Sequence, residues 1–149
     1  MQFTGTENFS VKELEYSDTA KSLKIDNTIP DDLEENTKRL LKFLQGIREA
    51  WGSGIKINSG YRGPKLNKAV KGSNTSAHLT CNAADLWPVN DKFEEFKEFI
   101  VKYLSDKNFD QCIIEQSLSK SGKVKSQWIH LGLYNNYGKQ RRQMFSMDV

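Results

Sequence analysis

The order and spacing of the predicted elements restrict the fold of this chain more than any other feature. Helical patterns dominate residues 8–51, and short strand patterns follow, with connections too brief for regular helical crossovers. Parallel strands need such crossovers, whereas antiparallel strands need only short turns. We therefore expect an α+β fold with a small, largely antiparallel sheet flanked by helices. A chain of 149 residues can bury one sizeable core, so we expect a single domain over residues 1–149.

Two long helices are predicted from apolar residues that recur at helical spacing. The first covers residues 30–51, with Pro30 at its first position and acidic residues near its start. The second runs from Asp91 to about Lys107, with a capping box between Asp91 and Glu94. Their core-facing stripes are expected to be Leu33, Leu40, Leu44, Ile47 and Trp51 in the first helix, and Phe93, Phe96, Ile100 and Tyr103 or Leu104 in the second.

Shorter elements are predicted around these helices. A capped helix is expected over residues 8–20, with Ser10 as N-cap and Glu13 completing a capping box, and a loop over residues 21–29. A short helix is expected over Lys65 to Val70. The tail from residue 134 to residue 149 has no predicted element. Strands are expected at residues 55–58, 82–87, 110–115 and 127–133, the last two forming a hairpin.

Both histidines of the chain lie in contexts typical of metal ligands. His78 precedes Asp85 by seven residues, with two alanines between them, and His130 lies in the predicted strand 127–133. Two imidazoles and one carboxylate are a common ligand set for catalytic zinc, which leaves one coordination position for water. We therefore predict a Zn²⁺ site formed by His78, Asp85 and His130. The alternative is that these are ordinary core or surface residues.

Composition and charge exclude several classes of protein. Hydrophobic residues make up 37% and charged residues 28% of the chain, and no apolar run approaches the ~20 residues that span a bilayer. Residues 1–7 show no Sec-type signal, so we expect synthesis in the cytoplasm. A net charge of +3 with scattered lysines predicts no nucleic-acid partner, and we expect a monomer. The basic stretch 139–143 is the one candidate for nucleic-acid binding, against a solvated helix or loop end.

The two cysteines, Cys81 and Cys112, do not indicate a disulfide-stabilised scaffold. We expect both to be reduced and partly buried. A disulfide between them is the alternative, if their strands are neighbours.

Three segments resemble the motifs of peptidase family M15. Residues 76–85 resemble the motif Ser-x-His-x-x-Gly-x-Ala-x-Asp, and Trp-Ile-His at residues 128–130 looks like the second motif. Ser-Gly-Tyr-Arg at residues 59–62, followed by Leu-Asn, is similar to the upstream segment of the family. This family comprises zinc D-alanyl-D-alanine carboxypeptidases and dipeptidases, and phage L-alanyl-D-glutamate endolysins, on the hedgehog/DD-peptidase fold. The resemblance extends over roughly residues 9–145.

The resemblance implies a zinc metalloprotease that hydrolyses peptidoglycan stem peptides, as a D,D- or L,D-carboxypeptidase or endopeptidase. It also implies that His78, Asp85 and His130 bind zinc, that Arg62 faces a substrate carboxylate, and that Ser76 donates a hydrogen bond at the edge of the site. A structural salt bridge is the alternative for Arg62, and turn capping for Ser76. The small size and the lack of a visible signal favour a phage or prophage lytic enzyme that acts on the cell wall.

Two residues depart from the family pattern. Several relatives have an acidic residue three positions before the last histidine, where this chain has Gln127, which cannot accept a proton. We predict Glu115 as the general base, because antiparallel pairing of its strand could bring it near His130; the alternative is a surface carboxylate. Cys81 replaces the family glycine, and it would be strained if that position needs a positive φ. As a fourth zinc ligand, Cys81 would close the site. Both departures favour an alternative function, a weak or inactive zinc-containing module that binds peptidoglycan.

Overall fold

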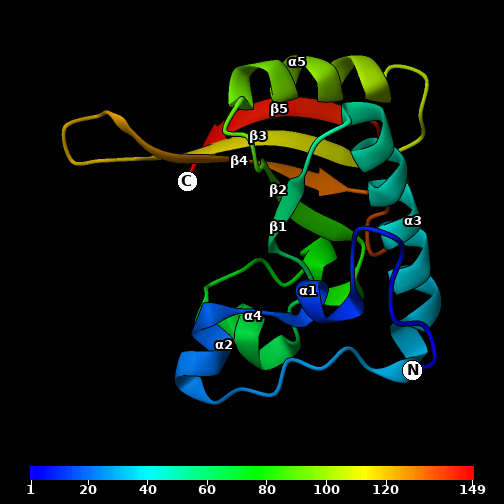
Figure 1. Ribbon diagram of the computed structural model, residues 1–149. Helices are drawn as coiled ribbons and strands as arrows, with labels where there is room; N and C mark the ends of the chain where they lie inside the picture. The colour runs from blue at the N-terminus through cyan, green and yellow to red at the C-terminus, as the bar shows by residue number, and fades with distance from the viewer.

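A five-stranded sheet runs through the centre of the molecule (Figure 1). The computed structural model describes residues 1–149. The strands are β1 (Ile55–Ser59), β2 (Ala83–Pro88), β3 (Gln111–Leu118), β4 (Val124–Gly132) and β5 (Gln143–Asp148). Their order across the sheet is β1-β2-β4-β3-β5, and all neighbours are antiparallel except β3 and β5, which are parallel. The predicted α+β fold with a largely antiparallel sheet is confirmed.

The two long helices pack against each other and against one face of this sheet (Figure 1). They are α3 (Glu34–Trp51) and α5 (Phe93–Leu104). Trp51 of α3 contacts Phe96 of α5 edge to face, with ring centroids 5.1 Å apart. Most of the predicted stripe residues are buried, whereas Leu33, Trp51 and Tyr103 are partly buried at its margin. The apolar periodicity therefore identified the helix faces that form the core.

The starts of both long helices differ from the prediction. Pro30 is extended and precedes a short 3-10 turn, η1 (Asp31–Leu33), before α3 begins. The predicted capping box between Asp91 and Glu94 is wrong, because α5 begins only at Phe93. Asp91 has a left-handed backbone with φ 60, and its carboxylate accepts a hydrogen bond from Trp87 Nε1 at 3.1 Å. The Asp91 carboxylate thus binds the indole of Trp87 and does not cap the helix.

Three short helices form the part of the molecule below the sheet in Figure 1. They are α1 (Val11–Glu15), α2 (Asp18–Leu23) and α4 (Pro64–Ala69). The capping box of Ser10 and Glu13 is confirmed. The single helix predicted over residues 8–20 is instead two, because Tyr16 is extended and the Ser17 side chain caps a new helix. That second helix also occupies part of the predicted loop 21–29.

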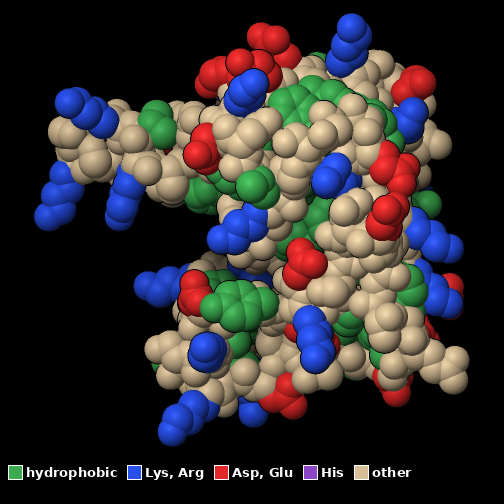
Figure 2. Space-filling model, in the orientation of Figure 1, with side chains coloured by type: hydrophobic (Ala, Val, Ile, Leu, Met, Phe, Trp, Pro, Cys, Tyr) green, Lys and Arg blue, Asp and Glu red, His purple; other side chains and the backbone are tan.

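The predicted hairpin is present, and its strands extend further than expected. Beyond residues 117 and 126 the ribbon of β3 and β4 projects from the body (Figure 1). We call residues 117–126 the hairpin arm; Figure 2 shows lysine side chains along it. Within the arm, the hydroxyls of Ser117 and Ser126 lie 2.6 Å apart across the two strands. The arm is therefore held together by its own cross-strand bonds.

The C-terminal strand β5 corrects the prediction of an element-free tail. All six of its residues are exposed, so its sequence lacks the alternation that marks a strand with one buried face. Pairing with β3 in parallel register, from Gln111 opposite Gln143 to Gln116 opposite Asp148, completes the sheet edge.

Both cysteines are buried free thiols, so the alternative of a disulfide between them is wrong. None of the helices has the length and apolar character needed to cross a membrane.

Candidate metal centre and cleft

The three predicted metal ligands converge in space. His78 lies in the 3-10 turn η2 (Ala77–Thr80), Asp85 on β2 and His130 on β4. One donor atom from each lies within 4.8 Å of the other two. The Oδ1 atom of Asp85 is 3.0 Å from His130 Nδ1 and 3.4 Å from His78 Nε2. The group contains no fourth cysteine, histidine or carboxylate.

Strand register explains how Asp85 and His130 meet. Their Cα atoms are direct partners in the antiparallel pair of β2 and β4. Directly opposed residues in such a pair project from the same face, so the carboxylate and the imidazole must lie side by side. The two ligands are thus placed by the sheet itself, without a loop to position either one.

His78 is oriented by a backbone carbonyl. Its Nδ1 lies 2.6 Å from the carbonyl oxygen of Gly60, which can only accept a hydrogen bond, so Nδ1 carries the proton and Nε2 faces Asp85. Gly60 itself packs tightly under α1, because a Cβ atom there would lie 2.7 Å from the Cα of Leu14. The glycine therefore allows the close approach that brings its carbonyl to the imidazole.

The turn that carries His78 is capped at both ends. Ser76 accepts a hydrogen bond from the main-chain nitrogen of His78 at 3.2 Å. Cys81 ends the turn in the left-handed conformation, with φ 57 and ψ 40, so cysteine occupies the strained backbone position that normally favours glycine. Its thiol accepts a hydrogen bond from Thr37 of α3 at 3.4 Å and lies outside the group of three donors.

The electrostatics of the group suit a cation. Burial disfavours the charged form of Asp85, but His78 and His130 outweigh that effect and hold the pKa of the carboxyl well below its usual range. Burial also lowers the pKa of His130, whereas the hydrogen bond and charge of Asp85 raise it, with a net increase. An ionised carboxylate and two imidazoles match the donors that zinc prefers. Because a proton on His130 competes with a cation, metal binding should weaken as the pH falls.

These donors lie in a cleft of about 690 Å³. On the face shown in Figure 2 the molecule is hollowed between the hairpin arm and the part that carries α2 and α4. The cleft brings together all the residues to which the sequence analysis assigned a role, namely Arg62, Ser76, His78, Asp85, Glu115 and His130. A cation held by the three donors would keep a side open to this cleft.

Glu115 lies on β3 opposite Trp128 of β4. Its Oε2 accepts a hydrogen bond from Trp128 Nε1 at 2.6 Å. Burial, and next the negative charge of Asp85, raise the pKa of Glu115. Gln127 lies on the opposite face of β4 from His130, where its side chain donates to Gln116. An acidic residue at position 127 would therefore point away from the three donors.

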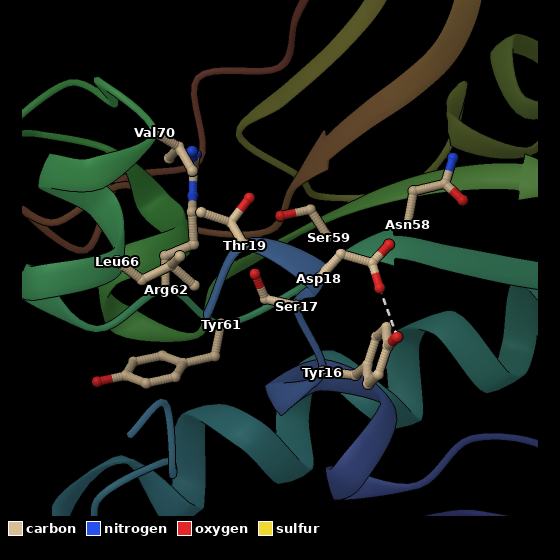
Figure 3. A pocket seen from close by; sticks show the side chains of 10 residues that line it. All are labelled: Tyr16, Ser17, Asp18, Thr19, Asn58, Ser59, Tyr61, Arg62, Leu66 and Val70. Atoms are coloured by element: carbon tan, nitrogen blue, oxygen red, sulfur yellow. Dashed lines mark hydrogen bonds between the residues drawn. The ribbon is translucent and has the colours of Figure 1, made fainter. Parts of the chain in front are cut away.

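Arg62 forms part of the other side of the cleft. Its Nη2 donates to Ser76 Oγ at 3.2 Å, and its main-chain nitrogen donates to the carbonyl of His78 at 3.1 Å. Its Nε is buried without a hydrogen-bond partner. No carboxylate pairs with this guanidinium, so the salt bridge considered as its alternative role is absent. A second cavity, of about 280 Å³, shares Arg62 and Val70 with the cleft (Figure 3).

The cleft also contains residues to which the sequence analysis gave no role. Asp110, only 1% exposed, accepts hydrogen bonds from Arg141 Nε at 2.7 Å and from Nη2 at 2.8 Å. Met147 and Val149 line the cleft from the C-terminal end of the chain. Met147 and Val149 could have been placed in the cleft only if the tail had been predicted to form a strand. The exposed residues of the tail show no alternation that would have predicted one.

Comparison with known proteins agrees with this site. The sequence model of the family described as Peptidase M15 matches residues 7–131, which is most of the chain and includes His78, Asp85 and His130. No curated protein matches the sequence significantly. A match over that length, together with the convergence of the motif residues, identifies this chain as a member of peptidase family M15.

Proposed function

We propose that this protein hydrolyses peptide bonds in peptidoglycan stem peptides, as a zinc-dependent D,D- or L,D-carboxypeptidase or endopeptidase. Peptidases of family M15 are zinc-dependent hydrolases, and this chain belongs to that family. The observation that carries the proposal is the placement of His78, Asp85 and His130 in an open cleft with Glu115 and Arg62.

The donor set fits zinc, and we assign His78 Nε2, Asp85 Oδ1 and His130 Nδ1 as its ligands. Bound zinc would supply a water of lowered pKa and polarise the carbonyl of the scissile bond. Glu115 is our candidate for the general base. One of its carboxylate oxygens is fixed by Trp128, and the other is free to accept a proton from water and return it to the leaving amine. Its raised pKa brings the carboxyl closer to the working range of such a base.

Arg62 is our candidate for binding a carboxylate of the substrate. Its half-buried guanidinium has an unpaired Nε and is held at the cleft by Ser76. A planar guanidinium donates two parallel hydrogen bonds to a carboxylate, which would orient the peptide over the metal ligands. Ser76 would act through Arg62 and through the turn that carries His78.

Two observations argue against the binding module. Gln127 points away from the cleft, and the Cys81 thiol bonds to Thr37. The peptidase is therefore the function that the site supports best, and action on the cell wall as a phage or prophage lytic enzyme stays a prediction.

The test is digestion of purified muropeptides, with products identified by mass. Wild type should release product only without a chelator, and added Zn²⁺ should restore the chelated sample. Loss of one terminal residue indicates a carboxypeptidase, and internal cleavage an endopeptidase. Glu115→Gln should lower kcat by a factor of about 10² or more, whereas Glu95→Gln, an exposed carboxylate on α5, should match wild type. Wild-type protein that binds peptidoglycan without cleaving it would favour the binding module.

A further inference from the structure

The cleft has two unlike sides. One side is formed by polar and cationic groups from the segment between β1 and β2, namely Arg62, Lys71, Ser73, Thr75 and Ser76. The other side comes from β3, β4 and the C-terminal end of the chain. Trp128, Met147 and Val149 make it apolar around Glu115, and the polar residues Asp110, Gln111 and Arg141 lie further along it. A peptide lying between them would meet hydrogen-bond donors on one flank and apolar side chains on the other.

Strand register places Met147 on this flank. In the sheet, Trp128 of β4 is the Cα partner of Glu115 on β3, and Glu115 is in turn the partner of Met147 on β5. Paired residues on adjacent strands project from the same face, so the three side chains form a row on the cleft side. Val149 continues this flank, because its main-chain nitrogen donates to the carbonyl of Gln116 at 2.8 Å.

These residues are available to a ligand. Met147 is 42% exposed and Val149 is 58% exposed, although both lie in a cleft rather than on a convex surface. Met144, on the same strand, is 40% exposed but projects from the opposite face and does not line the cleft. The family match ends at residue 131, so β5 lies outside the matched residues. Met147 and Val149 thus add to this flank from beyond the matched residues, whereas Trp128 lies within them.

We infer that Trp128, Met147 and Val149 form an apolar subsite that selects a small aliphatic side chain on a substrate residue next to the cleaved bond. This inference rests on the proposed function. A methyl or ethyl group would lose water contact against the methionine and the indole, which favours its binding. An acidic side chain in the same place would lie beside the carboxylate of Glu115, so the subsite disfavours it. The two flanks together orient the peptide, with its carboxylate toward Arg62.

The first experiment measures contact directly and does not depend on catalysis. The chain has three methionines, so ¹³C-methyl labelling gives three signals, from Met1, Met144 and Met147. A synthetic stem pentapeptide is titrated into metal-free and zinc-loaded protein. As the peptide saturates the protein, the Met147 signal should shift and the Met144 signal should stay in place. Equal shifts for both, or no Met147 shift at peptide concentrations that saturate the protein, would overturn the subsite.

The second experiment measures selectivity. Met147→Ala should raise KM for the alanine-containing peptide about tenfold with little change in kcat, as expected for loss of apolar contacts to one side chain. Met144→Ala is the matched control and should behave as wild type. Peptides with the alanine beside the cleaved bond replaced by aspartate should bind wild type worse, and Met147→Ala should narrow that difference. Identical kinetics for both variants would refute the subsite while leaving the peptidase intact. A Met147 shift without any cleavage would refute the peptidase while leaving the subsite intact.

Discussion

Replacing Asp110 by asparagine tests how the C-terminal strand is held in place. The buried Asp110 carboxylate accepts three hydrogen bonds from Arg141, two from the guanidinium and one from the main-chain nitrogen. The main-chain nitrogen of Gln143, at the start of β5, donates to the carbonyl of Asp110 at 2.9 Å. Asp110 therefore joins the end of the core to the strand that carries Met147.

The expected loss of stability follows from these contacts. Asp110→Asn keeps the shape of the side chain but removes its charge and turns one acceptor into a donor that faces the guanidinium. A hydrogen bond to a charged group contributes about 1.5–3 kcal/mol, and breaking a fully buried ion pair costs about 3–5 kcal/mol. The Arg141 side chain is 42% exposed, so water can solvate its charge after the substitution. We therefore expect the free energy of unfolding to fall by about 2–3 kcal/mol.

The effect should depend on pH in a defined direction. Burial tends to raise the pKa of Asp110, but the bonds from Arg141 outweigh it and lower the pKa below its usual value. A depressed pKa stabilises the folded state above the unfolded value of about 3.9 and loses that effect as the pH falls through the folded value. The difference between wild type and Asp110→Asn should thus be constant near neutral pH and shrink below about pH 4.

The assay is urea unfolding followed by tryptophan fluorescence at several pH values, with amide exchange of residues 143–148 as a local probe. Asp106→Asn is the control, because Asp106 forms an exposed pair with Lys107 and should leave stability at the wild-type value. Exchange at β5 should accelerate in Asp110→Asn. A loss below about 0.5 kcal/mol at neutral pH, or a loss that does not shrink in acid, would show that the pair does not hold the strand.

Three further outcomes are expected. Gly60→Ala should lower the free energy of unfolding by about 1–3 kcal/mol in urea, because its Cβ would overlap Leu14; an unchanged midpoint would contradict the packing. Burial raises the pKa of the Cys81 thiol to about 11 and that of Cys112 to about 12, so neither should react with a thiol reagent at pH 8 until the protein is unfolded. A chelator should lower the Tm and Zn²⁺ should restore it, since a ligand of the folded state stabilises it; an unchanged Tm would argue against a bound metal.

Elements with a buried, periodic face could be predicted from the sequence. The apolar stripes of α3 and α5 are visible in the sequence because each helix buries one side. The Ser10 capping box is visible because it is a local pattern between residues three apart. The strand β5 could not be predicted, because its exposed residues show no alternation and its pairing with β3 is long-range. Asp91 failed as a cap for a different, local reason, since Trp87 donates a hydrogen bond to its carboxylate.

The site was more predictable than its surroundings. The motif placed His78 and Asp85 close in sequence, and strand register then brought His130 to them. Glu115 was expected near His130 from strand pairing, and the two lie in one cleft. Side-chain alternation along β4 explains why Gln127 is turned away, because Gln127 and His130 lie three residues apart on one strand. The unpaired Arg62 Nε and the Asp110–Arg141 pair depend on packing between distant segments.

The hairpin arm has a practical consequence. Its tip at Ser121 and Gly122 is exposed, and its bonds run mainly within the ribbon, so a short tag inserted there should leave the rest of the molecule unaltered. Because β3 and β4 continue from the arm to Glu115 and Trp128, a fluorophore on that tip would be attached to the two strands that line the cleft. Such a labelled protein would allow ligand binding in the cleft to be tested optically without modification of any residue in the cleft.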